Sequence, residues 1–290
     1  MRIYITGIAG FVGSNLASKL HERGHFVRGC DTLQFGYREN LPEYIDWIIG
    51  DFHNTGHLDT FDVLVHCATS NIIYAQEHHI ETFKNNALNT ILLFEKFKGK
   101  IIYTSTASVY GNADDYPVKE SASIKTCNAY DTSKYISEIY LRQRGNYTTL
   151  RLSNVYGRNQ RAENPYCGVI GKFLNTAASG KKINIYGDGI DTRDFTYIDD
   201  TINGIIKAIE AEVLNTEINI SSGIETSIIN LAFKVCETVG VKFECDFIDR
   251  RKIDNINRRC VDNYKAKKLL KWEPCTTLSE GLKLTHMYIC

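Results

Sequence analysis

The feature that most constrains the fold is a glycine-rich turn close to the N-terminus, between two segments of different periodicity. Residues 3–6 form a short apolar run typical of a buried strand, and residues 11–20 place their apolar side chains near one face of a helix. Gly7, Gly10 and Gly13 occupy the turn and the start of that helix. Because glycine permits a tight turn and close packing of helix on strand, the pattern predicts a strand–turn–helix unit at the start of an α/β fold.

The same alternation continues through the first half of the chain. Further apolar runs follow at residues 25–31, 63–68, 101–105 and 149–153, with longer helical patterns between them. Strands that alternate with helices form parallel sheets covered by helices on both faces. We therefore expect a Rossmann-type, doubly wound parallel sheet, in which ligands bind beyond the carboxyl ends of the strands.

The regular alternation loosens after Gly157, where loop-rich segments begin. A length of 290 residues suits one large domain or two ordinary ones, and 4 prolines leave little material for a rigid linker. We predict a first domain over residues 1–157, to which part of 193–220 returns. A smaller α/β domain over residues 158–290 would then recognise the substrate.

The composition excludes several kinds of partner. Lys+Arg 34 and Asp+Glu 34 give a net charge of zero, whereas proteins that bind nucleic acids or membrane surfaces carry a basic excess. No apolar run approaches the ~18 residues of a membrane-spanning helix, and the sequence opens directly into a strand pattern, so we expect a cytoplasmic protein. The 9 cysteines show no zinc or redox spacing, so we predict no metal site.

The spacing of the three glycines also indicates a ligand. It is G-x-x-G-x-x-G, not the G-x-G-x-x-G of the best-known dinucleotide fingerprint, and glycines at such turns also serve packing alone. The turn lets backbone N–H groups and a helix N-terminus approach a pyrophosphate. Asp31 ends the second strand, where a carboxylate binds the ribose hydroxyls of NAD and repels the 2′-phosphate of NADP, so we predict NAD. Asp51 and Phe52 are candidates to flank the adenine, although Gly-Asp also forms plain turns.

A tyrosine and a lysine share one face of a later helix. Tyr130 and Lys134 stand four residues apart, so the ammonium can lie near the phenol. The pKa of tyrosine is normally about 10, and a neighbouring cation together with the positive nicotinamide should lower it enough for general-base chemistry. Thr106, at the end of a strand, offers a hydroxyl to the same substrate oxygen. Such pairs are common on amphipathic helices, so the assignment depends on the glycine turn and Asp31.

At this point the sequence resembles the extended short-chain dehydrogenases/reductases, in particular the NAD-dependent nucleotide-sugar epimerase/dehydratase family. The resemblance runs over nearly the whole chain. Besides the glycine turn and the Tyr–Lys pair, the matching segments are His66–Ala68, Asn85-Asn86, Ser105–Gly111, Arg151–Gly157, Tyr186–Gly189, Arg193–Asp200 and Lys265–Trp272.

The resemblance implies roles at the matching positions. Tyr130 would be the base, Lys134 its activator and ribose ligand, and Thr106 the hydroxyl partner. Asn154, Arg193 and Arg251 would hold the diphosphate of the substrate, although Arg193 could instead pair with its neighbouring aspartates. The expected cofactor contacts are Gly7, Gly10, Phe11, Val12, Gly13, Asp31, Asp51, Phe52, Ala68, Asn86, Tyr130, Lys134 and Ser153. A homodimer formed through the Tyr130 helix and the one before it is also implied.

The resemblance further implies oxidation at C4 of the sugar as a first step. Dehydratases of the family carry Asp-Glu directly after the active threonine, and decarboxylases carry Glu at the second of these positions. Here Ala107 and Ser108 stand there instead, which disfavours both lyases. We expect 4-epimerisation of a UDP- or GDP-linked sugar through a 4-keto intermediate. The alternatives are a C4 dehydrogenase or ketoreductase, then a 4,6-dehydratase, and last a non-catalytic NAD-binding sensor.

Departures from the family pattern lie mainly on the substrate side. Asp131 follows Tyr130 where glycine is commoner, and residues 251–254 read Arg-Lys-Ile-Asp in place of Arg-Pro-Gly-Asp. Arg258 or Arg259 falls near the position that gates the size of the sugar.

Overall fold

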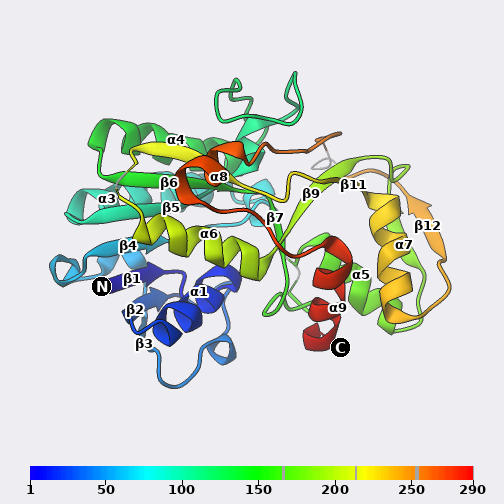
Figure 1. Cartoon of the computed structure of the whole chain (residues 1–290), viewed down its shortest axis with the longest axis horizontal. Helices are drawn as coiled ribbons and strands as arrows, with labels where there is room; N and C mark the ends of the chain where they lie inside the picture. The colour runs from blue at the N-terminus through cyan, green and yellow to red at the C-terminus, as the bar shows by residue number, and fades with distance from the viewer. Residues whose placement is uncertain (165–166, 213, 252–254, 290) are drawn as a thin grey trace.

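A sheet of seven parallel strands forms the centre of the molecule, in the order β10-β6-β5-β4-β1-β2-β3 (Figure 1). The computed structural model describes residues 1–164, 167–212, 214–251 and 255–289. The strands are β1 (Arg2–Thr6), β2 (Phe26–Asp31), β3 (Asp46–Ile49), β4 (Val63–His66), β5 (Lys100–Thr106), β6 (Tyr147–Leu152) and β10 (Thr216–Ile220). The predicted α/β class and parallel sheet are confirmed.

The central strands are almost entirely buried because helices cover both faces of the sheet. On β1, Ile3 and Ile5 point into one core while Tyr4 points into the other. Helices α1 (Phe11–Glu22) and α6 (Ile198–Glu210) pack together on the first side. The second side is covered by α3 (Thr90–Lys96) and α4 (Ala129–Arg144), preceded by α2 (His79–Phe83) and the π-helical segment η5 (Lys84–Asn89).

Short 3-10 helices occupy several connections of this layer. They are η1 (Arg38–Asn40), η2 (Phe52–Asn54), η3 (Leu58–Thr60), η4 (Tyr74–Gln76) and η6 (Ala107–Tyr110).

The chain leaves the large sheet after β6 and returns to it through α6 and β10, which pairs with β6. The segments between β6 and α6, and those after β10, build most of a smaller unit, which is seen on the right of Figure 1. One small sheet has the order β11-β9-β7, from Glu225–Ser227, Thr192–Tyr197 and Asn154–Tyr156, and another pairs β12 (Cys245–Ile248) with β8 (Ile183–Tyr186). The helices of this unit are α5 (Val169–Ala178), α7 (Ile228–Val239) and α9 (Leu278–Ile289), whereas α8 (Tyr264–Leu270) packs beside α6 and β10 of the large sheet.

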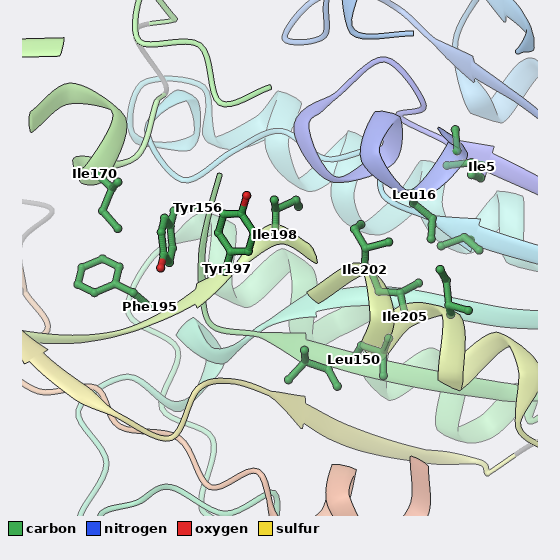
Figure 2. Packing of buried hydrophobic residues seen from close by; sticks show 14 of the residues in the cluster. Ile5, Leu16, Leu150, Tyr156, Ile170, Phe195, Tyr197, Ile198, Ile202 and Ile205 are labelled. Carbon is green, nitrogen blue, oxygen red and sulfur yellow. The ribbon is translucent and has the colours of Figure 1, made fainter. Parts of the chain in front are cut away.

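One hydrophobic cluster runs through both units (Figure 2). It extends from Ile170 on α5 and Phe195 on β9, past Tyr197 and Ile202, to Leu16 on α1. Burial of a shared core opposes independent motion of the units, because separating them would expose these side chains to water. The smaller unit is therefore fixed against the sheet. The division into domains at Gly157 stays a prediction.

Eight of the nine cysteines lie in the described part of the chain, and none of these eight forms a disulfide. Cys290 lies outside the described residues. Within the described ranges, no helix combines the length and apolar character needed to cross a membrane.

Candidate active site

Five of the predicted site residues meet at one edge of the large sheet. Gly7 follows β1, Asp31 ends β2, Ala68 follows β4, Thr106 ends β5 and Ser153 follows β6. Because all these strands are parallel, their carboxyl ends lie along the same edge. The topology thus assembles residues that are distant in sequence into one site.

The glycine turn forms a cradle that any side chain would fill. Gly7 has a φ of +68°, and a Cβ there would lie 2.7 Å from the backbone nitrogen of Ala68. At Gly13 a Cβ would lie 2.1 Å from the carbonyl oxygen of Gly7. Gly10 occupies the N-cap position of α1 and contributes no capping side chain. The turn and the helix dipole therefore fit the pyrophosphate of a dinucleotide.

Asp31 ties this turn to the second strand. Its carboxylate accepts hydrogen bonds from the backbone N–H groups of Ala9, at 3.0 Å, and Leu33, at 2.8 Å. Burial raises the pKa of Asp31, and the backbone donors oppose that shift. Each carboxylate oxygen retains further acceptor capacity, so Asp31 suits the ribose hydroxyls that the sequence assigned to it.

The side chains predicted around the adenine and nicotinamide differ in whether they are free to contact a ligand or are used inside the fold. Asp51 caps η2, accepting a hydrogen bond from the backbone of His53, whereas the Phe52 side chain packs in the core between the sheet and α3. Only the backbone of Phe52 is therefore placed to meet a ligand. Asn86 lies in the π-helical segment and exchanges two hydrogen bonds with the backbone of Ser70, at 2.7 and 2.9 Å, so its amide holds the loop after β4 in place.

The Thr106 hydroxyl lies close enough to the phenol of Tyr130 to lower its pKa. Thr106 ends β5 and also accepts the backbone N–H of Ser108 at 3.1 Å, while Tyr130 lies in the first turn of α4. Burial and the Asp131 charge raise the pKa of Tyr130 to about 12, and Thr106 and Arg259 act in the opposite direction. The phenol therefore needs additional positive charge before it can act as a base near neutral pH.

Lys134 follows Tyr130 by one turn of α4, and its expected role in lowering the pKa of Tyr130 together with the positive nicotinamide stays a prediction. Its ammonium is buried and lies 4.3 Å from the centre of the Tyr103 ring, an arrangement that favours a cation through the ring's quadrupole. Burial lowers the pKa of Lys134 to about 7. Desolvation outweighs attraction for both groups, because the helix that carries them packs tightly on β5.

The substrate-side candidates lie on or beside the smaller sheet. Ser153 donates a hydrogen bond to the carbonyl of Asp194 at 2.8 Å, and Asn154 begins β7 with an exposed side chain. Arg193 donates to the Thr192 carbonyl at 2.7 Å.

Two further observations bear on the predicted arginines. The carboxylate of Asp194 accepts hydrogen bonds from Ser222, Gly223 and Val261. These donors, and not its neighbour Arg193, are the hydrogen-bond partners of this carboxylate in the described part of the chain. Arg251 lies with its guanidinium 4.3 Å from the centre of the Tyr186 ring. Residues 252–254, which complete the altered motif, lie outside the described residues.

Two residues near Tyr130 had no role in the sequence-based site. Asp131 is buried, and burial raises its pKa to about 6. Arg259 is buried as well and donates to the Ser108 hydroxyl at 3.1 Å. Asp131 was visible as an unusual neighbour of Tyr130, and Arg259 as one of two arginines near the gating position. Nothing in the sequence showed that either side chain is buried.

A cavity of about 610 Å³ opens beside the start of α4. Its lining comes from the segment around η4, from α2, and from residues that flank Tyr130 in sequence, including Ala129 and Thr132. It is large enough for a small organic ligand.

A sequence model of the NAD dependent epimerase/dehydratase family matches residues 3–221, which is most of the chain. The chain belongs to this family. The predicted family is thereby confirmed, and with it NAD as the cofactor.

Individual relatives cover the chain almost completely. The UDP-glucose 4-epimerase of Mycolicibacterium smegmatis is 31% identical over 98% of this chain and 97% of its own. UDP-glucuronic acid decarboxylase 1 of Xenopus tropicalis is 31% identical over 99% of this chain and 72% of its own. The structure of UDP-glucose 4-epimerase from Thermotoga maritima with UDP-glucose has a TM-score of 0.94 at 31% identity, covering 99% and 98% of the two chains. The relatives are enzymes with different reactions, so the chain is an enzyme of this family and the site must indicate which reaction it catalyses.

Proposed function

We propose that this enzyme catalyses the NAD-dependent 4-epimerisation of a nucleotide-diphosphate sugar through a transient 4-keto intermediate. The observation that carries the proposal is that the Tyr130 phenol lies beside the Thr106 hydroxyl, while neither of the two residues after Thr106 can transfer a proton near neutral pH. Ala107 is 1% exposed and carries no polar group, and the Ser108 hydroxyl accepts a hydrogen bond from Arg259. An elimination or a decarboxylation needs an acid or base there, whereas a 4-epimerisation needs only the proton acceptor Tyr130.

Tyr130 takes the proton of the C4 hydroxyl and later returns it to the same oxygen. Thr106 binds that oxygen beside the phenol and so fixes the distance over which the proton moves. Reversible acceptance of the C4 hydrogen as hydride is the chemistry that bound NAD supplies. Rotation of the keto sugar before the hydride returns inverts C4, and the net reaction consumes neither cofactor nor water.

The cofactor-binding role that we assign to the sheet edge rests on the cradle described above. The backbone around Gly7, Gly10 and Gly13 would hold the pyrophosphate, and Asp31 the adenosine ribose. Lys134 would bind the nicotinamide ribose, and the positive nicotinamide would favour the phenolate of Tyr130.

On the substrate side we assign Asn154, Arg193 and Arg251 to the diphosphate, because guanidinium groups suit phosphate geometry. Residues 158–290 would form most of this second domain. We also propose a cytoplasmic location, where the absence of disulfides among the described cysteines is expected.

A product assay with a matched pair of variants tests the reaction. The purified enzyme is incubated with UDP- and GDP-sugars, and the products are followed by NMR together with absorbance of NADH. We expect the 4-epimer without net NADH, its loss in Tyr130→Phe with NAD still bound, and near-normal turnover in Tyr135→Phe, which alters the same helix one turn later. Accumulation of NADH and a keto sugar would show a dehydrogenase instead, and loss of water a dehydratase.

We further propose a homodimer formed through α4 and the helical segment before it. Large apolar side chains are exposed on these packed helical segments, with Ile80 at 77%, Leu88 at 55%, Leu92 at 45% and Ile139 at 40%. Several exposed apolar side chains on neighbouring helices are typical of a protein interface. Sedimentation should show a dimer that Leu88→Asp dissociates; a wild-type monomer at micromolar concentration would disprove it.

A further inference from the structure

Residues 255–258 are held by hydrogen bonds to the loop that follows η6. Asn112, from the loop after η6, donates to the carbonyl of Asn255 at 2.7 Å and accepts from the backbone of Asn257 at 3.0 Å. The Tyr116 hydroxyl donates to the carbonyl of Arg258 at 3.0 Å. Contacts from the larger unit therefore set the position of this segment up to Arg258.

The two consecutive arginines of this segment have opposite environments. Arg258 is exposed and forms a two-pronged ion pair with Glu225, with contacts of 2.7 to 3.0 Å. Arg259 turns inward and is 7% exposed. Of the two arginines near the predicted gating position, Arg259 is therefore the one that is buried.

Arg259 is a buried cation without a counter-ion in the described part of the chain. Across residues 1–164, 167–212, 214–251 and 255–289, the guanidinium has one hydrogen-bond acceptor, the Ser108 hydroxyl at 3.1 Å, and no salt bridge. The other buried guanidinium, that of Arg151, lies 2.6 Å from the carboxylate of Glu138 and also donates to Tyr110. Buried charges are normally paired in this second way, because an unpaired one loses its hydration without compensation.

The neighbours of Arg259 increase this deficit. Burial and the nearby Arg193 guanidinium lower the pKa of Arg259 to about 10, and the Asp131 carboxyl opposes them only in part. The site is therefore positively charged at a point where the larger and smaller units meet. An anionic ligand group would supply the missing charge, and guanidinium binds carboxylates in two-pronged geometry.

The position of Arg259 shows which part of the substrate carries that anion. Ser108 stands two residues after Thr106, and Arg259 is close enough to Tyr130 to influence its pKa. The anion thus lies beside the carbon on which Tyr130 acts. In a hexopyranose the diphosphate is attached at C1, across the ring from C4, whereas C6 is attached at C5, next to C4.

We propose that the substrate is a nucleotide hexuronate and that Arg259, with Ser108, binds its C6 carboxylate. The proposal rests on the proposed function, since it places C4 of the sugar at Tyr130. Because the Ser108 oxygen accepts from Arg259, its own hydrogen remains available for the carboxylate. Arg259 then favours acidic over neutral sugars, because its buried charge gains a counter-ion only when the acidic sugar is bound.

The test compares acidic and neutral sugars on the same nucleotides. The holoenzyme is assayed by NMR and calorimetry with UDP-glucuronate and UDP-glucose, and with GDP-mannuronate and GDP-mannose. We expect kcat/KM for one acidic sugar to exceed that for its neutral partner by about 100-fold, as for recognition of a charged group by a buried ion pair. In Arg259→Gln this preference should disappear because kcat/KM falls for the acidic sugar and stays unchanged for the neutral one. Arg259→Lys should retain part of the preference.

Arg258→Gln is the matched control, one residue away and paired on the surface, and it should keep the preference. A wild-type preference for neutral sugars, or an equal loss of both sugars in Arg259→Gln, would overturn the proposal. Thermal unfolding distinguishes a role of Arg259 in substrate binding from a role in holding the fold together. If Arg259 serves binding, removal of its unpaired buried charge should leave Arg259→Gln at least as stable as the wild type. A clear loss of stability would also count against it.

The products distinguish this inference from the proposed reaction. If binding of the acidic sugar depends on Arg259 but the products are a pentose and CO2, or a keto sugar and NADH, the hexuronate inference holds and the epimerase proposal fails. If a neutral sugar is epimerised equally well by wild type and Arg259→Gln, the epimerase proposal holds and the hexuronate inference fails.

Discussion

Replacement of Asp131 by asparagine should stabilise the enzyme above neutral pH and leave it no more stable near pH 4. Asp131 is buried, its Oδ2 accepts from the Asn128 amide at 2.8 Å, and its Oδ1 has no hydrogen-bond partner within the described ranges. Burial raises its pKa from 3.8 to about 6. A carboxyl whose pKa is higher in the folded state than in the unfolded state costs stability as pH rises through that interval.

The magnitude follows from the two pKa values. At about 1.4 kcal/mol per pKa unit, ionising Asp131 in the folded state costs about 3 kcal/mol at pH 8. The new amide keeps an oxygen for the Asn128 donor but buries N–H groups without an acceptor, which costs about 1 kcal/mol. The net gain of about 2 kcal/mol corresponds to a rise in Tm of about 4 °C for a chain of this size.

Differential scanning calorimetry of wild type and Asp131→Asn from pH 4 to pH 8 measures this difference directly. Asp199→Asn is the control, because Asp199 lies in the first turn of α6 with its side chain 56% exposed and should change stability by less than about 1 kcal/mol with no gain at high pH. The charge of Asp131 also raises the pKa of Tyr130, so the variant should shift the activity profile to lower pH. A stability difference independent of pH would refute the reasoning.

Three further predictions concern the cofactor site and the core. Asp31→Asn should weaken NAD binding about 10- to 100-fold by calorimetry and reduce the preference over NADP, and an unchanged preference would remove Asp31 from the ribose site. Gly13→Ala should lower stability by more than about 3 kcal/mol in urea, because its Cβ would lie 2.1 Å from a backbone oxygen. Gly50→Ala is the control, because a Cβ at Gly50 would have no atom within 4 Å, and it should change stability by less than about 1 kcal/mol. Equal losses of stability in the two variants would show that the turn at Gly13 is not closely packed. Glu138→Gln should cost about 3–5 kcal/mol by leaving the Arg151 charge buried alone, and adding Arg151→Met should recover most of it. A single variant that loses less than about 1 kcal/mol would show that the pair is not coupled.

The parts of the site that could be predicted from the sequence are those with a local signal. The glycine turn and Asp31 are adjacent to strands whose apolar runs are unmistakable, and parallel strands bring their carboxyl ends together without further information. Thr106 and Tyr130 are found by the same logic, since one ends a strand and the other begins a helix that packs on it.

The parts that could not be predicted depend on contacts between distant residues. Asn112 and Asn257, which position the Arg259 segment, are 145 residues apart in sequence. The surroundings of Lys134 depend on the Tyr103 ring on a neighbouring strand. No spacing rule within the helix shows that desolvation would raise the pKa of Tyr130 and lower that of Lys134.

The sequence by itself therefore determined the alternation of strands and helices and indicated the glycine turn and Tyr130 as candidates for the cofactor site and the proton acceptor, because each depends on residues within one strand–turn–helix unit. Only the tertiary structure decided which of the adjacent Arg258 and Arg259 is buried, and that the buried one has no ion-pair partner among the residues the structure describes. The physical reason is that the cost of a charge depends on the water it loses and the partners it gains, and both come from segments far away along the chain.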